Sequence, residues 1–335
     1  MSKFNNINNK QSNRYQPLPF VVPVIVLFIL GICFLLTPLK LHAQDSDKSI
    51  VIIYQSSQDF SQQLITNLQQ SFKSSGYKPL KVMLTPDNTP QKIKLLKTHQ
   101  YKLLIAIGSE TTKTLLDANI QTPILSALIP RHIYKSLKQT HKNKNNWSSL
   151  LINQPIERQL QLITAVMGKN KKTAILLGPY TKDLNQPLNK ASTKTTQHLS
   201  IQEIKTSDQI PEALDSLNSS VDVLLTIPDP VIYNRNTLRG ILLASYRKKL
   251  PLIGFSQSYV KSGAIAAIYS KPEQISQQIS DITKSFFIHQ SFKKTTYYPN
   301  DFSLALNKNI ARSLGIKLAP SQTIVNQIKK AEKNQ

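Results

Sequence analysis

The stretch from residue 221 to residue 269 constrains the fold more than any other part of the chain. Three apolar runs lie within it, at residues 221–227, 250–255 and 264–269. Between the first two runs, apolar side chains recur from Leu238 to Tyr246 at three- and four-residue spacing, which predicts a helix. Buried neighbouring strands joined through a helix indicate a parallel sheet, because parallel strands need a long crossover between them.

The chain after residue 48 repeats this alternation of buried strand and amphipathic helix. The expected strands before residue 221 are residues 49–54, 80–84, 102–107, 123–128, 147–152, 172–177 and 199–204. A chain of 335 residues exceeds the length at which one core stops growing, about 250–300 residues, so two lobes are expected. The series predicts an α/β fold: a two-lobed clamp in which each lobe is a mainly parallel sheet flanked by helices, with a ligand cleft between the lobes.

The same order suggests the boundaries of the lobes. Residues 48–150 are expected to form lobe 1, which residues 270–290 complete, and residues 151–268 are expected to form lobe 2. Residues 291–335 are expected to be a C-terminal segment that packs across the lobes. Its polar end, KKAEKNQ, is expected to fray.

The N-terminal segment indicates export. Lys3, Lys10 and Arg14 precede an apolar run at residues 20–36 without any acidic residue, and a small residue for cleavage follows, so residues 1–43 are predicted to be a signal peptide. The alternative is an uncleaved anchor, because the run approaches the roughly 17–25 residues that span a bilayer. We therefore expect a periplasmic protein, either free or anchored to the membrane through residues 20–36.

The composition argues against some classes of site and partner. Cys33 is the only cysteine, so the part after residue 43 can hold neither a disulfide nor a cysteine-bound metal. A net charge of +24 is compatible with nucleic-acid binding, but the lysines are spread through every segment, and we expect no nucleic-acid partner. A generally basic surface instead favours acidic partners or an anionic membrane face.

Two segments carry a family resemblance. Residues 251–256 read PLIGFS, before Val260 and GAIA at residues 263–266, and residues 307–311 read NKNIA, before LGI at residues 314–316 and Pro320. On these segments and on the order of its elements, the chain after residue 48 resembles the substrate-binding proteins of ABC transporters, in the branch with the type I periplasmic-binding fold. The resemblance implies two lobes that close on a small molecule, often an amino acid or a related solute, and hand it to a membrane permease.

The chain departs from the family pattern near the expected pocket. Gly-Thr-Pro-Ala is common after the third strand and Asp-Pro-Val after the fourth, whereas residues 108–111 here read GSET and residues 129–131 read IPR. The glycine that is usual in the late helix is replaced around Ser276. The ligand class of the family therefore does not carry over to this chain.

The candidate ligand-binding residues follow the predicted strands, since ligands of parallel sheets bind outside the carboxyl ends of the strands. They are Ser56, Ser57, Gln58, Gly108, Ser109, Thr111, Thr112, Arg131, Tyr180, Asp229, Tyr233, Ser256, Gln257 and Tyr259. We expect the loops at residues 228–233 and 256–259 to form one jaw of the cleft, facing residues 56–58 and 108–112.

Residues 108–112 stand where a strand meets a helix N-terminus, whose free amides favour an anion such as a carboxylate. Helix capping by Ser109 would explain the same residues without a ligand. Glu110 disfavours an anion there but could meet a ligand ammonium. For residues 56–58, ligand contact and the ordinary polarity of a loop are equal alternatives.

The remaining candidates also have two interpretations. Asp229 stands between two prolines at the end of a central strand, where its carboxylate would accept hydrogen bonds from a ligand amine or cap a helix that starts near Tyr233. Tyr180, Tyr233 and Tyr259 would stack on a ligand or pack at the edge of the core. Arg131 would bind a carboxylate through two hydrogen bonds or lie exposed in a loop.

Two other functions compete with solute transport. The six histidines form no metal-ligand spacing, and no nucleophile elbow, phosphate loop or pair of catalytic carboxylates stands out. We therefore expect no catalysis, metal or cofactor, and a hydrolytic enzyme is the less favoured alternative. A ligand sensor that signals to a membrane receptor would use the same clamp, and nothing in the residues separates it from a transport protein.

Overall fold

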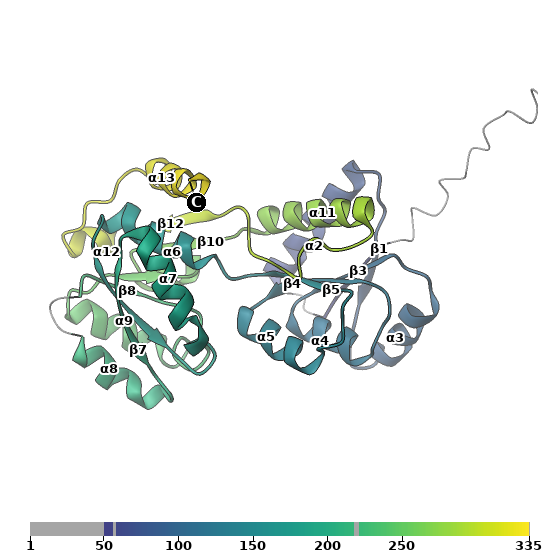
Figure 1. Ribbon diagram of the computed structural model, residues 1–335, viewed down its shortest axis with the longest axis horizontal. Helices are drawn as coiled ribbons and strands as arrows, with labels where there is room; N and C mark the ends of the chain where they lie inside the picture. Colours follow the sequence, from purple (N-terminus) through teal and green to yellow (C-terminus); the bar gives the residue numbers. More distant parts are fainter. Residues whose placement is uncertain (1–49, 56–57, 218–220, 335) are drawn as a thin grey trace, which may run out of the picture. The chain divides into compact units, whose positions relative to one another are not determined.

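Two six-stranded β-sheets, each mainly parallel, carry the fold (Figure 1). The computed structural model describes residues 50–55, 58–217 and 221–334. Strands alternate with helices along almost the whole of this part, as the sequence pattern predicts for α/β lobes. The prediction of a two-lobed α/β fold is confirmed.

Lobe 1 is built on the sheet β11-β5-β4-β3-β1-β2, in which all neighbouring strands are parallel. Its strands are β1 (Ile50–Tyr54), β2 (Leu80–Met83), β3 (Leu103–Ile107), β4 (Ile124–Ile129), β5 (Trp147–Leu151) and β11 (Thr296–Tyr297). Its helices are α2 (Asp59–Ser74), α3 (Thr89–Thr98), α4 (Ser109–Asp117), α5 (Arg131–Thr140) and α11 (Pro272–His289).

Strand β1 shows why both faces of this sheet are covered. Ile50 and Ile52 pack into an apolar cluster with side chains of α2 and α11. The alternate residues Val51 and Ile53 pack into a second cluster with side chains of α3, α4 and α5. Because successive side chains of a strand point to opposite faces, a strand buried on both faces must be apolar throughout, as this one is.

Lobe 2 is built on the sheet β12-β10-β9-β8-β6-β7, in which β12 is antiparallel to β10 and the other neighbours are parallel. Its strands are β6 (Lys172–Leu177), β7 (His198–Glu203), β8 (Val223–Leu225), β9 (Leu252–Gly254), β10 (Ala266–Tyr269) and β12 (Ser303–Leu306). Its helices are α6 (Ile156–Met167), η2 (Lys182–Leu184), α7 (Asn185–Thr195), η3 (Ser207–Gln209), α8 (Ile210–Ser216), α9 (Leu238–Arg247), α10 (Gln257–Ser262), α12 (Lys308–Ser313) and α13 (Ser321–Lys333). The three apolar runs of residues 221–269 therefore hold β8, β9 and β10, and α9 is the helix predicted between the first two.

The two sheets are connected by three segments, at residues 152–155, 270–271 and 298–302. Hydrogen bonds tie these segments to one another. The amide nitrogen Nε2 of Gln154 donates to Ser270 Oγ at 2.8 Å, and Ser270 Oγ donates to the carbonyl oxygen of Asp301 at 3.0 Å. We call residues 152–155, 270–271 and 298–302 the crossing segments.

Arg158 on α6 reinforces the crossing segments. Arg158 is 4% exposed, and its guanidinium group donates to Gln154 Oε1 at 2.8 Å. It also donates to the carbonyl oxygens of Pro299 and Asn300, at 2.8 and 2.9 Å, and forms an ion pair with Glu332 of α13. One buried side chain thus joins two crossing segments to the C-terminal helix.

Two predictions for lobe 2 are wrong. The helix expected to start near Tyr233 begins at Leu238, because Thr237 Oγ1 donates to the Ile232 carbonyl oxygen and Asn234 closes a turn before the helix. Residues 256–259 are not a loop, since α10 begins at Gln257.

The expectation of a frayed C-terminal end is also wrong. Helix α13 continues to Lys333. Its residues Ile324 and Ile328 are fully buried in the core of lobe 2, and Glu332 holds the last turn through Arg158. The polar sequence KKAEKNQ gives no indication of this anchoring, because Arg158, the partner of Glu332, lies far away in the sequence.

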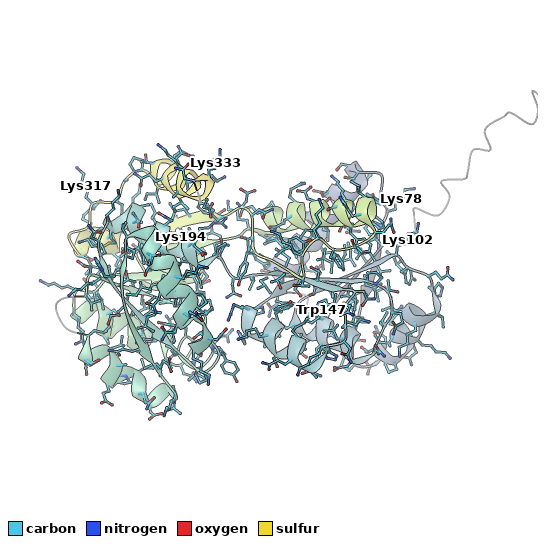
Figure 2. All side chains as sticks on the ribbon, viewed as in Figure 1. Lys78, Lys102, Trp147, Lys194, Lys317 and Lys333 are labelled. Carbon is cyan, nitrogen blue, oxygen red and sulfur yellow. The ribbon has the colours of Figure 1, made fainter. Side chains whose placement is uncertain are left out.

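Positive charge is spread over the surface of both lobes (Figure 2). Lys78 and Lys102 are exposed in lobe 1, and Lys194, Lys317 and Lys333 are exposed in lobe 2. Among the described residues, no helix is long and apolar enough to cross a membrane. The predicted signal peptide or anchor at residues 1–43 lies outside the described residues.

Candidate ligand-binding site

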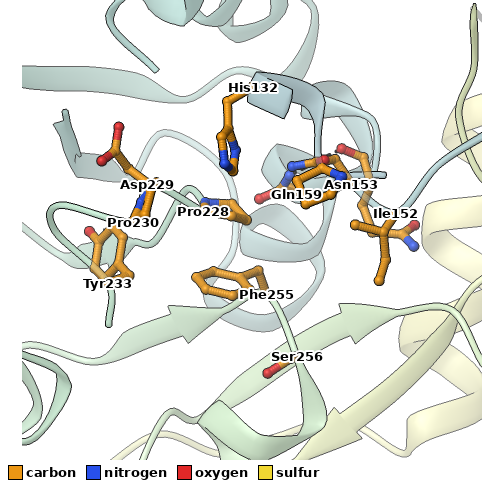
Figure 3. Close-up of a pocket in the computed structure, with 12 residues that line it drawn as sticks. His132, Ile152, Asn153, Gln159, Pro228, Asp229, Pro230, Tyr233, Phe255 and Ser256 are labelled. Atoms are coloured by element: carbon orange, nitrogen blue, oxygen red, sulfur yellow. Dashed lines mark hydrogen bonds between the residues drawn. The ribbon is translucent and has the colours of Figure 1, made fainter. Parts of the chain in front are cut away.

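A cavity of about 350 Å³ draws its lining from both lobes (Figure 3). The described lining residues are Pro130, His132, Ile152, Asn153, Gln154, Gln159, Pro228, Asp229, Pro230, Tyr233, Phe255 and Ser256. They follow the carboxyl ends of β4 and β5 in lobe 1 and of β8 and β9 in lobe 2, apart from Gln159 on α6. Ligands of parallel sheets bind at such strand ends.

Apolar and aromatic groups form much of this lining. Phe255, Ile152, Pro228 and Pro230 are labelled in Figure 3, and Pro130 also lines the cavity. The Phe255 ring packs on Tyr259, with ring centroids 4.2 Å apart, and meets the edge of Tyr233 at 6.2 Å. Tyr259 is buried behind Phe255, and burial raises the pKa of both tyrosines, so that their hydroxyls stay protonated.

Asp229 lines the cavity, but its carboxylate is occupied by the protein. It is 1% exposed and accepts hydrogen bonds from the Tyr180 amide at 3.0 Å, Thr181 Oγ1 at 2.9 Å and the Val231 amide at 2.9 Å. In Figure 3 the carboxylate points away from the other labelled lining residues. We expected a choice between a ligand amine and a helix cap. Instead, the carboxylate ties the turn after β6 to the segment after β8.

Gly178 makes room for this arrangement. It is the first residue after β6, and a Cβ atom at its position would lie 2.4 Å from Asp229 Cγ. The absence of a side chain at residue 178 is therefore what lets the carboxylate reach the Tyr180 amide and Thr181.

Neutral amides supply polar groups on the other side of the cavity. Asn153 Oδ1 accepts a hydrogen bond from the Arg131 amide at 2.7 Å. Gln154 is engaged at both ends, by Ser270 and Arg158. Gln159 Nε2 donates to the Gln154 carbonyl oxygen at 3.2 Å, whereas Gln159 Oε1 is buried without a hydrogen-bond partner among the described residues.

His132 is the titratable group on the lobe 1 side of the cavity. Burial lowers its pKa, although the nearby Asp229 carboxylate acts in the opposite direction. Its ring meets the edge of the Tyr180 ring, with centroids 5.4 Å apart. At neutral pH the imidazole is therefore uncharged and can both donate and accept a hydrogen bond.

An ion pair joins the two lobes beside the cavity. Arg131, at the start of α5, donates through Nη1 and Nη2 to the two carboxylate oxygens of Asp183 in η2, at 3.2 and 2.5 Å. Lys135 Nζ lies 2.6 Å from Asp183 Oδ2. Partial burial alone would raise the pKa of Asp183, but the hydrogen bonds from Arg131 and Lys135 outweigh it and lower that pKa to about 2.

A family model decides where the protein belongs. The model described as ABC transporter substrate binding protein matches residues 49–327. The chain belongs to the ABC transporter substrate-binding protein family. The resemblance seen in residues 251–256 and 307–320 is thus confirmed.

Solved structures show the fold of this substrate-binding protein. A ligand-free, open substrate-binding protein with adhesive properties from Clostridium difficile has a TM-score of 0.62 and 17% identity, over 82% of this chain and 96% of that one. A Streptococcus pneumonia ABC domain in complex with L-Trp has a TM-score of 0.53 and 16% identity, over 83% and 98% of the chains. A conserved domain protein from Vibrio cholerae has a TM-score of 0.54 and 20% identity, over 84% and 98%. At these identities the likeness shows the type I periplasmic-binding fold alone. A comparison with curated proteins gave no match.

The substrate-binding protein brings three of the predicted site residues to the cavity. These are Asp229, Tyr233 and Ser256. Ser256 Oγ accepts a hydrogen bond from the Tyr259 amide and so caps α10, at 3.4 Å, while Gln257 is exposed. Tyr180 is half exposed and Tyr259 supports Phe255, and neither is among the described lining residues.

The lobe 1 candidates are placed elsewhere than expected. Thr111 and Thr112 are buried, and Thr112 Oγ1 donates to the Gly108 carbonyl oxygen at 2.8 Å. Gly108 itself is the N-cap of α4, with φ of 92°, and Ser109 is the first residue of the helix. Residues 108–112 are not among the described lining residues, and Gln58 is exposed at the N-terminus of α2. Ser56 and Ser57 lie outside the described residues.

Sequence reasoning missed several residues that line the cavity. His132, Asn153, Gln154 and Gln159 were not predicted, and Phe255 was assigned only to a strand. Strand ends offered a signal for His132 and Asn153, because they follow β4 and β5, whereas Gln159 lies within a helix and gave none. Among the described residues, no group of three or more histidine, cysteine, aspartate or glutamate residues could hold a metal ion.

Proposed function

We propose that this protein is an exported solute-binding protein that captures a small organic molecule between its lobes and delivers it to the permease of an ABC importer. One observation carries the proposal: the cavity of about 350 Å³ takes its lining from strand ends of both lobes. A molecule that contacts both lobes stabilises whichever lobe arrangement makes those contacts best, and a permease can recognise that arrangement.

Several features support binding rather than catalysis as the role of the cavity. Its carboxylate, Asp229, already accepts three hydrogen bonds from the protein. The imidazole of His132 contacts the Tyr180 ring. Among the described residues, no carboxylate forms a hydrogen bond with His132 that would orient it as a catalytic base. The lining therefore suits recognition of a solute by shape and neutral hydrogen bonds.

Export is part of the same proposal. The basic and apolar segments of residues 1–43 have the layout of a signal peptide, and family membership supports a place outside the inner membrane. Determination of the N-terminal residue of the protein purified from the periplasm distinguishes cleavage near residue 43 from an intact anchor.

The binding test uses the exported protein and a library of small solutes. Thermal-shift screening followed by calorimetry should find a solute that binds and is recovered unchanged. Phe255→Ala should weaken its affinity about 10- to 100-fold, because full burial of a phenylalanine side chain stabilises by roughly 1.5–3 kcal/mol. Phe287→Ala is the matched control, since Phe287 is also partly buried but packs in lobe 1 with Tyr77.

Two results would contradict the proposed function. One is the absence of any stabilising solute across a broad library, and the other is chemical turnover of the bound solute. Uptake of the identified solute by cells that lack this protein tests delivery to a permease, and unchanged uptake would limit the role of the protein to binding.

A further inference from the structure

A groove on lobe 2 lies apart from the ligand cavity. Its volume is about 570 Å³, and residues of α9 and of the turn before α9 form most of its lining (Figure 1). Ser262 and Gly263 at the end of α10 and Ile310 of α12 complete the lining. None of the described residues that line this groove also lines the ligand cavity, so the groove is a separate surface.

Helix α9 turns apolar side chains toward the groove that the lobe does not bury. Leu243 and Tyr246 line the groove and are 49% and 50% exposed, and Leu238 and Leu242 of the same helix line it too. Ser245 is instead 3% exposed, and its hydroxyl has no hydrogen-bond partner among the described residues. An amphipathic helix normally buries its apolar face. A groove with several apolar side chains and a charged rim is typical of a site of interaction with another molecule.

Arginine is concentrated on the same part of lobe 2. The chain has 35 lysines, spread over both lobes, but only seven arginines, six of them in the described part. Two of these six form ion pairs with acidic residues. The other four are exposed and form no ion pair with a described residue: Arg235, Arg239, Arg247 and Arg312. Arg235 and Arg239 line the groove itself, so the general basic composition of the chain does not account for this clustering.

No acidic side chain is among the described residues that line the groove. Between Asp229 and Glu273 the chain has seven basic residues and no acidic one, and this stretch includes α9 and α10. Asp215 of α8 pairs with Lys248, which does not line the groove. The charge of the two groove arginines is therefore not compensated locally, and a guanidinium group binds a carboxylate through two parallel hydrogen bonds.

The shape and charge of the groove favour one kind of occupant. A helix that binds a bilayer inserts an apolar face into a flat surface, whereas the apolar side chains of α9 line a hollow that the side chains of a partner protein can fill. A second copy of this chain is a poor source of carboxylates, because 42 basic and 18 acidic residues make two copies repel each other. The ten residues of α9 extend over about 15 Å, which a short peptide segment can cover.

We propose that the groove binds an acidic, amphipathic segment of a partner protein. Its apolar side chains contact Leu243 and Tyr246, and its carboxylates bind Arg235 and Arg239. Tyrosine and arginine contribute most often to the affinity of protein interfaces, so we expect Tyr246 and the two arginines to dominate this one. The inference goes beyond solute binding and requires no solute in the ligand cavity.

Fluorescence anisotropy with a synthetic peptide and the whole exported protein tests the proposal. The probe is an acetylated helical peptide of about 14 residues, with leucine on one face and glutamate on the other. The control peptide has glutamine in place of every glutamate. At about 0.15 M salt, which screens charges that are not in contact, we expect the glutamate peptide to bind at least about tenfold more tightly than the glutamine peptide.

Two charge variants separate the groove from the net charge of the protein. Arg235→Gln/Arg239→Gln should weaken binding of the glutamate peptide by about tenfold or more and leave the Tm unchanged, because both side chains are exposed. Lys94→Gln/Lys97→Gln is the matched control, since it removes the same charge from the exposed surface of α3 in lobe 1. Its affinity should differ from that of the wild type by less than about twofold.

A second pair of variants tests the apolar contacts. Leu243→Ala/Tyr246→Ala should weaken binding of the glutamate and glutamine peptides alike, by about tenfold, because both peptides carry the same leucine face. Leu95→Ala is the control, because Leu95 on α3 is 46% exposed and lies outside the groove. Its affinity for either peptide should equal that of the wild type.

Four results would overturn the proposal, and none of them bears on solute binding in the ligand cavity. The first is the absence of binding of the glutamate peptide to the wild type, and the second is an equal loss of affinity in the two charge variants. The third is binding to phosphatidylglycerol vesicles that depends on Arg235 and Arg239 while the peptide does not bind, which would assign the groove to a membrane surface. The fourth is a dimer of the wild type that Leu243→Ala/Tyr246→Ala abolishes, which would assign the groove to a second copy.

Discussion

Substitution of Gly178 by alanine tests the placement of Asp229 most directly. The new Cβ atom would lie 2.4 Å from both Cγ and Oδ1 of Asp229 and 2.5 Å from Oδ2. Contacts of that length are far inside van der Waals distance, so the carboxylate must move away. Its hydrogen bonds to the Tyr180 amide, Thr181 Oγ1 and the Val231 amide then weaken or break.

The expected destabilisation follows from two contributions. Inserting a methyl group into a closely packed site costs about 1–3 kcal/mol, and a hydrogen bond to a charged group contributes about 1.5–3 kcal/mol. Because the three bonds to Asp229 act as a unit, they do not add in full, and we expect Gly178→Ala to cost about 2–4 kcal/mol. For a domain of this size that corresponds to a decrease in Tm of roughly 5–10 °C.

A second glycine in the same lobe provides the control. Gly240 lies within α9, and a Cβ atom there would have no neighbour within 4 Å. Gly240→Ala should therefore stabilise the protein by about 0.5–1 kcal/mol, because alanine loses less conformational entropy in a helix. The same chemical change thus has opposite signs at residues 178 and 240.

The assay is a double-mutant cycle followed by chemical and thermal unfolding. Asp229→Ala alone should destabilise, because it leaves the donors of Tyr180, Thr181 and Val231 without their acceptor. In the double variant Gly178→Ala/Asp229→Ala the clash is gone, so its stability should equal that of Asp229→Ala within about 0.5 kcal/mol. Additive effects of the two substitutions, or a Gly178→Ala protein as stable as the wild type, would refute this packing.

Two further predictions concern the charged groups that connect the lobes. Arg158→Lys should lower the free energy of unfolding by about 2–4 kcal/mol, because one ammonium group cannot replace the guanidinium hydrogen bonds to Gln154, to two carbonyl oxygens and to Glu332. Thermal unfolding measures this loss of stability, and a variant as stable as the wild type would contradict the prediction. Asp183→Asn should remove a stabilisation that is fully present above the unfolded pKa of about 3.9 and is lost as the pH falls through the folded pKa of about 2. The difference in Tm between wild type and Asp183→Asn should therefore be nearly constant from pH 7 to about 5, decrease as the pH falls further, and vanish below about pH 2. A difference that disappears above pH 5 would exclude the pair with Arg131 as its source.

The fold could be predicted from the sequence because local and tertiary requirements agree. A strand such as IVIIY in β1 is apolar throughout, and only a sheet covered on both faces buries all of it. The helix predicted from Leu238 to Tyr246 appears as α9 for the same reason: its spacing and its buried face coincide.

The site was predicted less well because its geometry depends on contacts between distant residues. Asp229 was identified as a fixed carboxylate, but its partners at residues 180 and 181 and the space left by Gly178 are not readable from its neighbours in the sequence. Gln159 belongs to an ordinary helical pattern, and only the tertiary structure places it beside Asn153 and Phe255 in the cavity. Local sequence patterns therefore predicted where the strands end. Which of the residues at those strand ends line the cavity could be seen only in the tertiary structure.

The crossing segments have a consequence for the order in which the chain becomes structured. Strand β5 gains its outer neighbour only from β11, and β10 gains its outer neighbour only from β12, both encoded after residue 295. Until those residues leave the ribosome, β5 and β10 are themselves unpaired edge strands, and such edges are sites of misassembly. Neither lobe is formed by one continuous stretch of sequence. A stop codon near residue 290 would therefore leave two incomplete sheets, rather than one intact lobe and one missing lobe.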